Sequence, residues 1–195
     1  MDGLPPDLAD LAQSGPAGAA EACRRFCCDI ATAVAIRPCR VEDLPAILRI
    51  YNDDIETGVA TWDETPWTMQ AREAWFAGHD DSTPVLIAES AGAVVGFAYL
   101  TMMSAKSGWR FTREDTIYLD SKVRGQGVGD LLLGALLESA RAIGVHLVVA
   151  SITSTNVASL ELHRKHGFED AGTLRGAGFK FGQWLDTTHM QRILE

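Results

Sequence analysis

The sequence predicts a single α/β domain. At 195 residues the chain is long enough to bury one good core, and nothing in its length requires two. Strand-like and helix-like patterns alternate along most of the chain. In its middle, a strand pattern at 115–119 is followed by a glycine-rich loop at 124–129 and an apolar helix pattern at 131–142. This strand, loop and helix unit is the most informative segment of the sequence.

The folded domain is expected to span residues 35–195. Residues 1–34 are rich in Ala, Gly, Pro and Asp, and Pro5-Pro6 and Gly15-Pro16 interrupt regular structure. We interpret residues 1–34 as an N-terminal extension, either a flexible tail or a loosely attached helix over 14–30. A mis-chosen start codon and a regulatory or docking element are the alternatives.

The first elements of the domain follow from residue patterns. A strand at 34–37 precedes an amphipathic helix, because the apolar residues Leu44, Ile47, Leu48 and Tyr51 recur at helical spacing. Residues 68–77 predict a further helix. The two apolar runs 84–89 and 93–100, separated by Ala91-Gly92, predict a hairpin.

The second half continues the alternation. After the helix at 131–142, residues 146–152 predict a buried strand, and residues 159–166 predict a helix that stops at Gly167-Phe168. Residues 187–194 predict a closing strand. No internal repeat is present in the sequence.

Charge and composition limit the function. The chain has 26 acidic and 17 basic residues, a net charge of -9, which repels nucleic-acid phosphates and anionic lipid surfaces. No apolar run approaches the roughly 20 residues of a membrane helix, and the first residues are acidic, not basic. We therefore expect a cytoplasmic protein that binds small molecules, with neither nucleic acid nor membrane as a partner.

The four cysteines do not form a metal-binding pattern. Cys23, Cys27 and Cys28 are too closely spaced for paired CxxC ligands, and only the fold could bring Cys39 to them. We expect reduced thiols, as in cytosolic proteins, and no metal.

The loop from Arg124 to Gly129 predicts a phosphate-binding site. Successive backbone amides at a helix N-terminus can cradle phosphate oxygens, and glycines let the backbone approach the ligand closely. The loop is not a P-loop, since no GK[ST] follows, and Asp130 stands where the dinucleotide pattern GxGxxG needs its third glycine. These departures disfavour an ATP- or NAD-dependent enzyme. A flexible turn is the alternative for the loop alone.

The same loop resembles the acyl-CoA loop of the GNAT superfamily, [RQ]xxGx[GA], with Arg124, Gly127 and Gly129 at its specified positions. GNAT proteins pair that loop with a later Asn and a following helix that closes on Gly-Phe or Gly-Tyr. Two motifs in the right order support the resemblance more strongly than either alone. The residues that carry this second motif are Asn156, Ser159, His163, Lys165, Gly167 and Phe168.

Within the superfamily the chain resembles the phosphinothricin and methionine sulfoximine acetyltransferase group over about residues 36–194. The resemblance implies the GNAT fold, a mixed, twisted sheet of six to seven strands flanked by helices, in which two central strands splay apart to admit acyl-CoA. It also implies acetyl-CoA as co-substrate and a homodimer. The motifs that carry this likeness are 50–56, 60–62, 114–118, Leu162-His163 and 178–186.

The resemblance implies direct acetyl transfer in a ternary complex. An amine arrives as an ammonium ion, so the reaction needs a base, and Glu114 occupies the position of the family's catalytic glutamate. A solvated surface Glu is the alternative. A fixed backbone amide in the strand segment Ile117-Tyr118-Leu119 would stabilise the oxyanion. His163, where many GNAT enzymes have Tyr, would protonate or stabilise the departing thiolate, or else be a packing residue.

The resemblance also implies the binding residues. Asn156 is suited to the pantetheine amides, Lys165 to a phosphate, and Lys106 to a substrate carboxylate. A solvated surface Lys is the alternative for Lys165. The remaining histidines, His79, His146, His166 and His189, carry no motif, and we expect no chemical role for them. The expected cofactor site comprises Ile117, Tyr118, Leu119, Arg124, Gly125, Gln126, Gly127, Val128, Gly129, Asp130, Asn156 and Lys165. The expected substrate site comprises Trp62, Lys106, Trp109, Asp115 and Thr116. Trp62, Lys180 and Trp184 are candidates for the acceptor pocket or the subunit contact, and the core is the alternative for the two tryptophans.

The predicted function is acetylation of the free amine of an amino-acid-like substrate such as phosphinothricin, methionine sulfoximine or methionine sulfone. One alternative in the same class is acetylation of another metabolite amine or a protein N-terminus. The alternative in a different class is a non-catalytic acyl-CoA-binding sensor. Glu114 and the acceptor-side motifs argue against the sensor.

Overall fold

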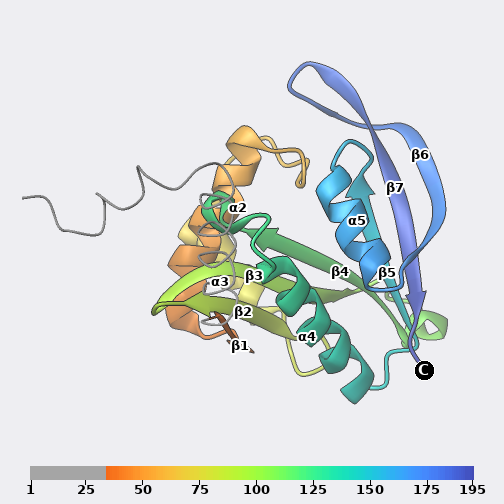
Figure 1. Cartoon of the computed structure of the whole chain (residues 1–195), viewed down its shortest axis with the longest axis horizontal. Helices are drawn as coiled ribbons and strands as arrows, with labels where there is room; N and C mark the ends of the chain where they lie inside the picture. Colours follow the sequence, from red (N-terminus) through yellow and green to blue (C-terminus); the bar gives the residue numbers. More distant parts are fainter. Residues whose placement is uncertain (1–33) are drawn as a thin grey trace, which may run out of the picture.

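The computed structural model describes residues 34–195 and contains a seven-stranded mixed sheet in the order β1-β2-β3-β4-β5-β7-β6 (Figure 1). The expected sheet of six to seven strands is confirmed. The predicted extension falls almost wholly outside the described residues, which begin at the first residue of β1. None of the helices within residues 34–195 is long and apolar enough to span a membrane.

The strands are antiparallel to their neighbours except at the centre of the sheet, where β4 and β5 run parallel. This single parallel pair is the place where the sheet opens. The strands are β1 Val34–Pro38, β2 Val85–Ser90, β3 Ala93–Met102, β4 Thr112–Leu119, β5 Leu147–Thr153, β6 Glu169–Lys180 and β7 Gln183–Ile193.

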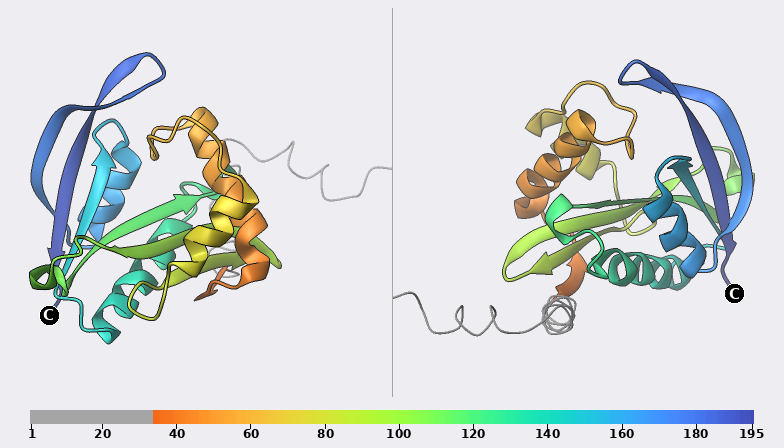
Figure 2. Two further views of the ribbon diagram at one scale, coloured as in Figure 1. Left: turned by 180° about the vertical axis from the view of Figure 1, so that it is seen from behind. Right: turned by 45° about the horizontal axis from the view of Figure 1, so that its top comes forward.

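Among the described residues, α2 (Leu44–Thr57) and α3 (Met69–Ala77) cover one face of the sheet, and α4 (Val128–Ala142) and α5 (Val157–Lys165) cover the other (Figures 1 and 2). On the first face α2 and α3 enclose a core that includes Phe97 and Tyr118. On the other, α4 and α5 pack on the larger core. Three short 3-10 turns, η2 (Val41–Asp43), η3 (Ser107–Trp109) and η4 (Ser121–Val123), complete the elements of the described chain.

The helices form for the local reasons expected from the sequence. The α2 residues Ile47, Ile50 and Tyr51 share one buried face at helical spacing. The Thr68 hydroxyl caps α3 by accepting the Ala71 amide proton at 3.2 Å. Most predicted helices and strands begin and end within a few residues of their expected bounds.

The central strands separate along their length. Backbone pairing of β4 with β5 runs only from Thr112↔Leu147 to Asp115↔Ala150. Residues 116–119 of β4 continue to pair with β3, while 151–153 of β5 continue to pair with β7. The two halves of the sheet diverge beyond that point (Figure 2), so the expected splay is confirmed.

The structure corrects three predicted strand positions. β6 was not expected, because it carries three glycines, Gly172, Gly176 and Gly178, and nearly all its residues are exposed, so no apolar alternation marks it. The closing strand begins at Gln183, where residue 187 was expected. Glu114 lies inside β4, two residues after its start, where we expected it just before the strand.

Candidate active site

The glycine loop leads into the N-terminus of α4. Gly125 and Gly127 have φ values of 75° and 83°, in the left-handed region that favours glycine. A side chain at Gly129 would come within 3.2 Å of Leu162 and 3.3 Å of Leu119. Two glycines therefore make the turn and the third allows close packing, leaving the first amides of α4 exposed to an anion.

A cavity of about 620 Å³ extends from this loop into the splay between β4 and β5. Every predicted cofactor residue lines it except Gln126 and Val128. The Val128 side chain is fully buried in the core, and the Gln126 side-chain amide donates to the Lys122 carbonyl. The cavity is also lined by residues that were not assigned to the cofactor site from the sequence, although Asp54, Ala60, Ser159 and Leu162 stand in the quoted motifs. These residues are Asp54, Gly58, Val59, Ala60, Thr155, Ala158, Ser159, Glu161 and Leu162.

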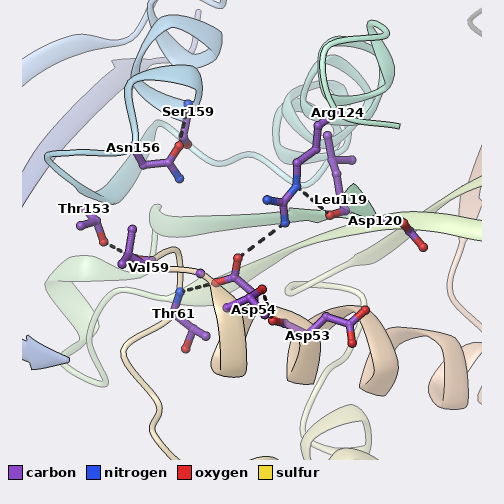
Figure 3. A network of polar contacts seen from close by, with 12 residues as sticks. Asp53, Asp54, Val59, Thr61, Leu119, Asp120, Arg124, Thr153, Asn156 and Ser159 are labelled. Atoms are coloured by element: carbon purple, nitrogen blue, oxygen red, sulfur yellow. Dashed lines mark hydrogen bonds and ion pairs between the residues drawn. The ribbon is translucent and has the colours of Figure 1, made fainter. Parts of the chain in front are cut away.

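Asp54 makes several contacts in the part of the cavity wall that was not predicted from the sequence (Figure 3). Its carboxylate accepts the Thr61 amide proton at 3.0 Å and lies 3.6 Å from the Arg124 guanidinium. A Cβ on Gly58 would lie 2.2 Å from Asp54 Oδ1, so a side chain there would displace the carboxylate from this position. Arg124 in turn donates to the Leu119 carbonyl at 3.3 Å. Through Arg124, the end of α2 is thereby joined to the end of β4 in the lining of the cavity.

Asn156 and Lys165 line the opposite side, on α5. The Asn156 Oδ1 caps the helix by accepting the Ser159 amide proton at 3.2 Å, so its NH₂ group is the part that can donate to a ligand. Lys165 contacts the Asp130 carboxylate, and His166 Nε2 lies 2.8 Å from it. The hydrogen bond from Lys165 lowers the pKa of Asp130 and offsets its charge beside the amide cradle.

A second cavity of about 140 Å³ adjoins the first and shares with it Ala60, Ile117, Tyr118, Asn156 and Ser159. Glu114 lines it, together with Thr116 from the same strand. The Glu114 carboxylate accepts a hydrogen bond from the Ser151 hydroxyl at 2.5 Å. The predicted base therefore lies at the closed end of the splay, beside the space that continues into the larger cavity.

His163 and Asp115 form a buried pair at the edge of the second cavity. His163 Nε2 lies 3.0 Å from Asp115 Oδ2, and Nδ1 lies 2.7 Å from the Ser159 carbonyl oxygen. Burial alone would lower the pKa of His163, but the Asp115 hydrogen bond and charge and the Ser159 carbonyl raise it above its ordinary value. Because both ring nitrogens face acceptors, the surroundings favour the imidazolium form of the ring.

The other predicted substrate residues are dispersed. Trp62 donates from its indole to the Thr153 hydroxyl at 2.9 Å, and Thr153 lines the second cavity. Lys106 and Trp109 are exposed in the segment after β3, and neither lines either cavity. Trp184 is 70% exposed and is not a core residue. The functional roles predicted for all of these residues stay predictions.

Three of the four cysteines lie outside the described residues. Within the part of the chain that the structure describes, no group of three or more His, Cys, Asp or Glu side chains is arranged to hold a metal ion. Cys39 is a free thiol there, and burial raises its pKa to about 12.

Comparison with known proteins identifies the family. A model described as the acetyltransferase (GNAT) family matches residues 45–168, more than half of the chain. The chain belongs to the GNAT acetyltransferase family. An L-methionine sulfoximine/L-methionine sulfone acetyltransferase of Pseudomonas paraeruginosa is 45% identical over 163 residues, 83% of this chain and 95% of that protein.

Solved GNAT structures share the fold. A ribosomal-protein-alanine N-acetyltransferase from Brucella melitensis is 44% identical, with a TM-score of 0.80 over 82% of this chain and 99% of that one. A phosphinothricin acetyltransferase from Sinorhizobium meliloti, solved in complex with AcCoA, is 37% identical, with a TM-score of 0.79 over 83% of this chain and 89% of that one.

The GNAT site of this chain fits acetyl-CoA as co-substrate. The amide cradle suits a pyrophosphate, and the larger cavity continues from it into the splay, where an extended pantetheine arm can lie. Beyond Asp115, the β4 backbone edge that faces β5 has no partner strand within residues 34–195. The chain is therefore an acetyltransferase in which the larger cavity, which fits acetyl-CoA, adjoins the smaller cavity lined by the base candidate Glu114.

Proposed function

We propose that this GNAT acetyltransferase transfers the acetyl group of acetyl-CoA directly to the free α-amine of a small amino-acid analogue of the phosphinothricin, methionine sulfoximine or methionine sulfone type. The observation that carries the proposal is the position of the Glu114 carboxylate, at the closed end of the splay and in the lining of the 140 Å³ cavity. A cavity of that size suits a small acceptor. The names of two relatives, 45% and 37% identical, point to the same substrate class.

The cofactor is proposed to lie across both sides of the splay. Amides at Gly125–Gly129 and the Arg124 guanidinium bind the pyrophosphate, since both offer donors to phosphate oxygens. The Asn156 NH₂ group donates to the pantetheine arm. The thioester then lies beside residues 117–119, whose amides on the β5 side are not used by the sheet.

Glu114 is proposed to accept a proton from the acceptor ammonium, which frees the nitrogen lone pair to attack the thioester carbon. As the C–N bond forms, negative charge develops on the carbonyl oxygen, and those amides of the segment Ile117–Leu119 that face away from β3 stabilise it. The C–S bond then breaks and the thiolate leaves. Because His163 lines the same cavity as an imidazolium, we propose that its positive charge stabilises this thiolate.

We further propose a cytoplasmic homodimer that does not bind nucleic acid or membrane. Three large apolar side chains, Phe179, Phe181 and Trp184, are each about half exposed or more near the β6–β7 turn. Such clusters favour protein contacts. Size-exclusion chromatography with light scattering tests the dimer, and a monomer at micromolar concentration would contradict it.

A second candidate within the same enzyme class is acetylation of a protein N-terminus. The similar Brucella melitensis structure named ribosomal-protein-alanine N-acetyltransferase favours it. The smaller cavity favours a free amino acid analogue instead. A peptide that begins with alanine therefore belongs in any substrate panel.

Thiol release from acetyl-CoA tests the proposal. The acceptors are phosphinothricin, methionine sulfoximine, methionine sulfone, ordinary amino acids and the alanine peptide, each with wild-type enzyme and Glu114→Gln. We expect turnover of the sulfoximine-type compounds, lost by about 100-fold or more in Glu114→Gln. Glu138→Gln, at an exposed position of α4, is the matched control and retains activity. Acetyl-CoA binding without thiol release from any acceptor would refute the substrate class and favour a sensor.

A further inference from the structure

Two side chains with no predicted role adjoin the proposed base. Ser151 on β5 donates to Glu114 on β4, and its Oγ lies 3.1 Å from Nδ1 of His189 on β7. Ser151 and His189 are direct partners in the β5–β7 ladder, so their side chains share one face of the sheet. Three strands, widely separated in sequence, therefore contribute one side-chain network: β4, β5 and β7.

The direction of each hydrogen bond follows from the groups present. An ionised carboxylate only accepts, so the single hydroxyl hydrogen of Ser151 points to Glu114 Oε1. The 3.1 Å contact between Ser151 Oγ and His189 Nδ1 then requires Nδ1 to carry a hydrogen and to donate it to Oγ. The network runs from His189 through Ser151 to Glu114, and it occupies one carboxylate oxygen while leaving Oε2 for the acceptor amine.

The position of the network matters because it stands where the backbone ladder ends. Backbone pairing of β4 with β5 stops at Asp115↔Ala150. Ser151 is the next residue of β5, and its side chain joins the two strands at the first position where the ladder no longer does. Without this bond the Glu114 carboxylate would be free to rotate at the closed end of the splay, since Ser151 is its one side-chain hydrogen-bond partner among residues 34–195.

We propose that Ser151 and His189 are positioning residues that hold the Glu114 carboxylate in the orientation that accepts the proton of the acceptor amine. The inference rests on the proposed role of Glu114 as the base. Ser151 fixes the carboxylate, and His189 fixes the Ser151 hydroxyl by occupying its lone pair. Fixing the reacting group lowers the entropic cost of reaching the productive geometry.

The test uses matched pairs of variants at both ends of the network. Ser151→Ala removes the hydroxyl, and Ser151→Thr keeps it on a residue that strands favour. His189→Phe removes the donor, and His189→Asn keeps an N–H near the place of Nδ1. Ser154→Ala is the control, because Ser154 forms a 2.8 Å hydroxyl bond with Thr188 and does not contact Glu114.

We expect Ser151→Ala to lower kcat by about tenfold or more, while the KM for acetyl-CoA changes by less than about twofold. Ser151→Thr recovers most of the lost kcat. His189→Phe lowers kcat by a smaller factor, and His189→Asn restores it. Ser154→Ala keeps the kcat of the wild-type enzyme.

Two results would overturn the proposal. One is a Ser151→Ala kcat equal to that of Ser151→Thr, and the other is an equal loss in His189→Asn and His189→Phe. Thermal unfolding of each variant guards against misfolding, and if Ser151→Ala does not fold, the His189 pair decides the question alone. The Glu114→Gln variant distinguishes a failure of the proposed base from a failure of the proposed network. Full activity in Glu114→Gln would refute both proposals. An inactive Glu114→Gln together with a fully active Ser151→Ala would refute only the role of the network.

Discussion

Replacing Asp115 by Asn tests the buried ion pair with His163. Both side chains are 2% exposed or less, and the two partners lie 3.0 Å apart. Asn has the shape of Asp but no charge. In the variant a buried imidazolium would have no counter-charge, so the His163 ring becomes neutral, and its Nε2 accepts a hydrogen bond from the side-chain amide of the introduced asparagine.

The size of the effect follows from the two hydrogen bonds. A bond that involves charged partners stabilises by about 1.5–3 kcal/mol, and a neutral one by about 0.5–1.5 kcal/mol. The variant therefore loses about 1–2 kcal/mol of unfolding free energy when the wild-type ring is charged.

The loss must also depend on pH. In the wild-type protein the pKa of His163 is raised, so the stabilisation is complete below the unfolded pKa of about 6.5 and is lost as the pH rises through the folded pKa. In the variant, burial without a counter-charge lowers the pKa of the ring, so stability rises with pH. The difference between the two proteins therefore shrinks from acid to alkaline pH.

Urea unfolding from about pH 5.5 to about pH 9 measures this difference. Asp53→Asn is the control, because Asp53 forms an exposed ion pair with Arg49 at 3.6 Å, and we expect nearly no effect from its loss. A cost of Asp115→Asn that stays constant across this range, or grows with pH, would refute the assignment of a charged His163.

Two further predictions concern the contacts that hold β6 against the end of α2. The buried Lys180 ammonium donates to the backbone carbonyls of Asp54, Gly58 and Thr61 at 3.3, 2.9 and 2.7 Å. Urea unfolding of Lys180→Met should therefore show a loss of about 3–5 kcal/mol of unfolding free energy. A loss below about 1 kcal/mol would contradict a stabilising role for the three hydrogen bonds. A Cβ on Gly178 would lie 2.2 Å from the Trp62 ring, so Gly178→Ala should cost about 1–3 kcal/mol, and adding Trp62→Phe should recover part of it in a double-mutant cycle. Strict additivity of the two changes would argue against the contact.

The glycine loop could be predicted because its chemistry is local. Arg124, Gly127 and Gly129 lie within six residues, and the amides they expose belong to the same turn. The Gly125 and Gly127 backbones need no distant partner to adopt positive φ. The same holds for α2 and α4, whose apolar periodicity marks the face that the sheet buries.

The network around Glu114 could not be predicted in this way. Ser151 and His189 lie 37 and 75 positions after Glu114, and only strand register brings the three together. Neither residue carries a motif. Asp54 was within a recognised motif, yet its contacts with Thr61 and Arg124 depend on how the chain turns after α2. β6 lacked a pattern because an exposed edge strand has no face that must be apolar.

Glu114 and Asp115 are consecutive carboxylates with different surroundings, and strand geometry is the cause. Successive side chains of β4 point to opposite faces, so Glu114 meets Ser151 on the α2–α3 side while Asp115 meets His163 on the α5 side. Pairing with Thr101 and Leu100 of β3 fixes this register. A slip of one residue would bury Glu114 against His163 and present Asp115 to the acceptor, so the antiparallel pairing of β3 with β4 decides which carboxylate can act as the base.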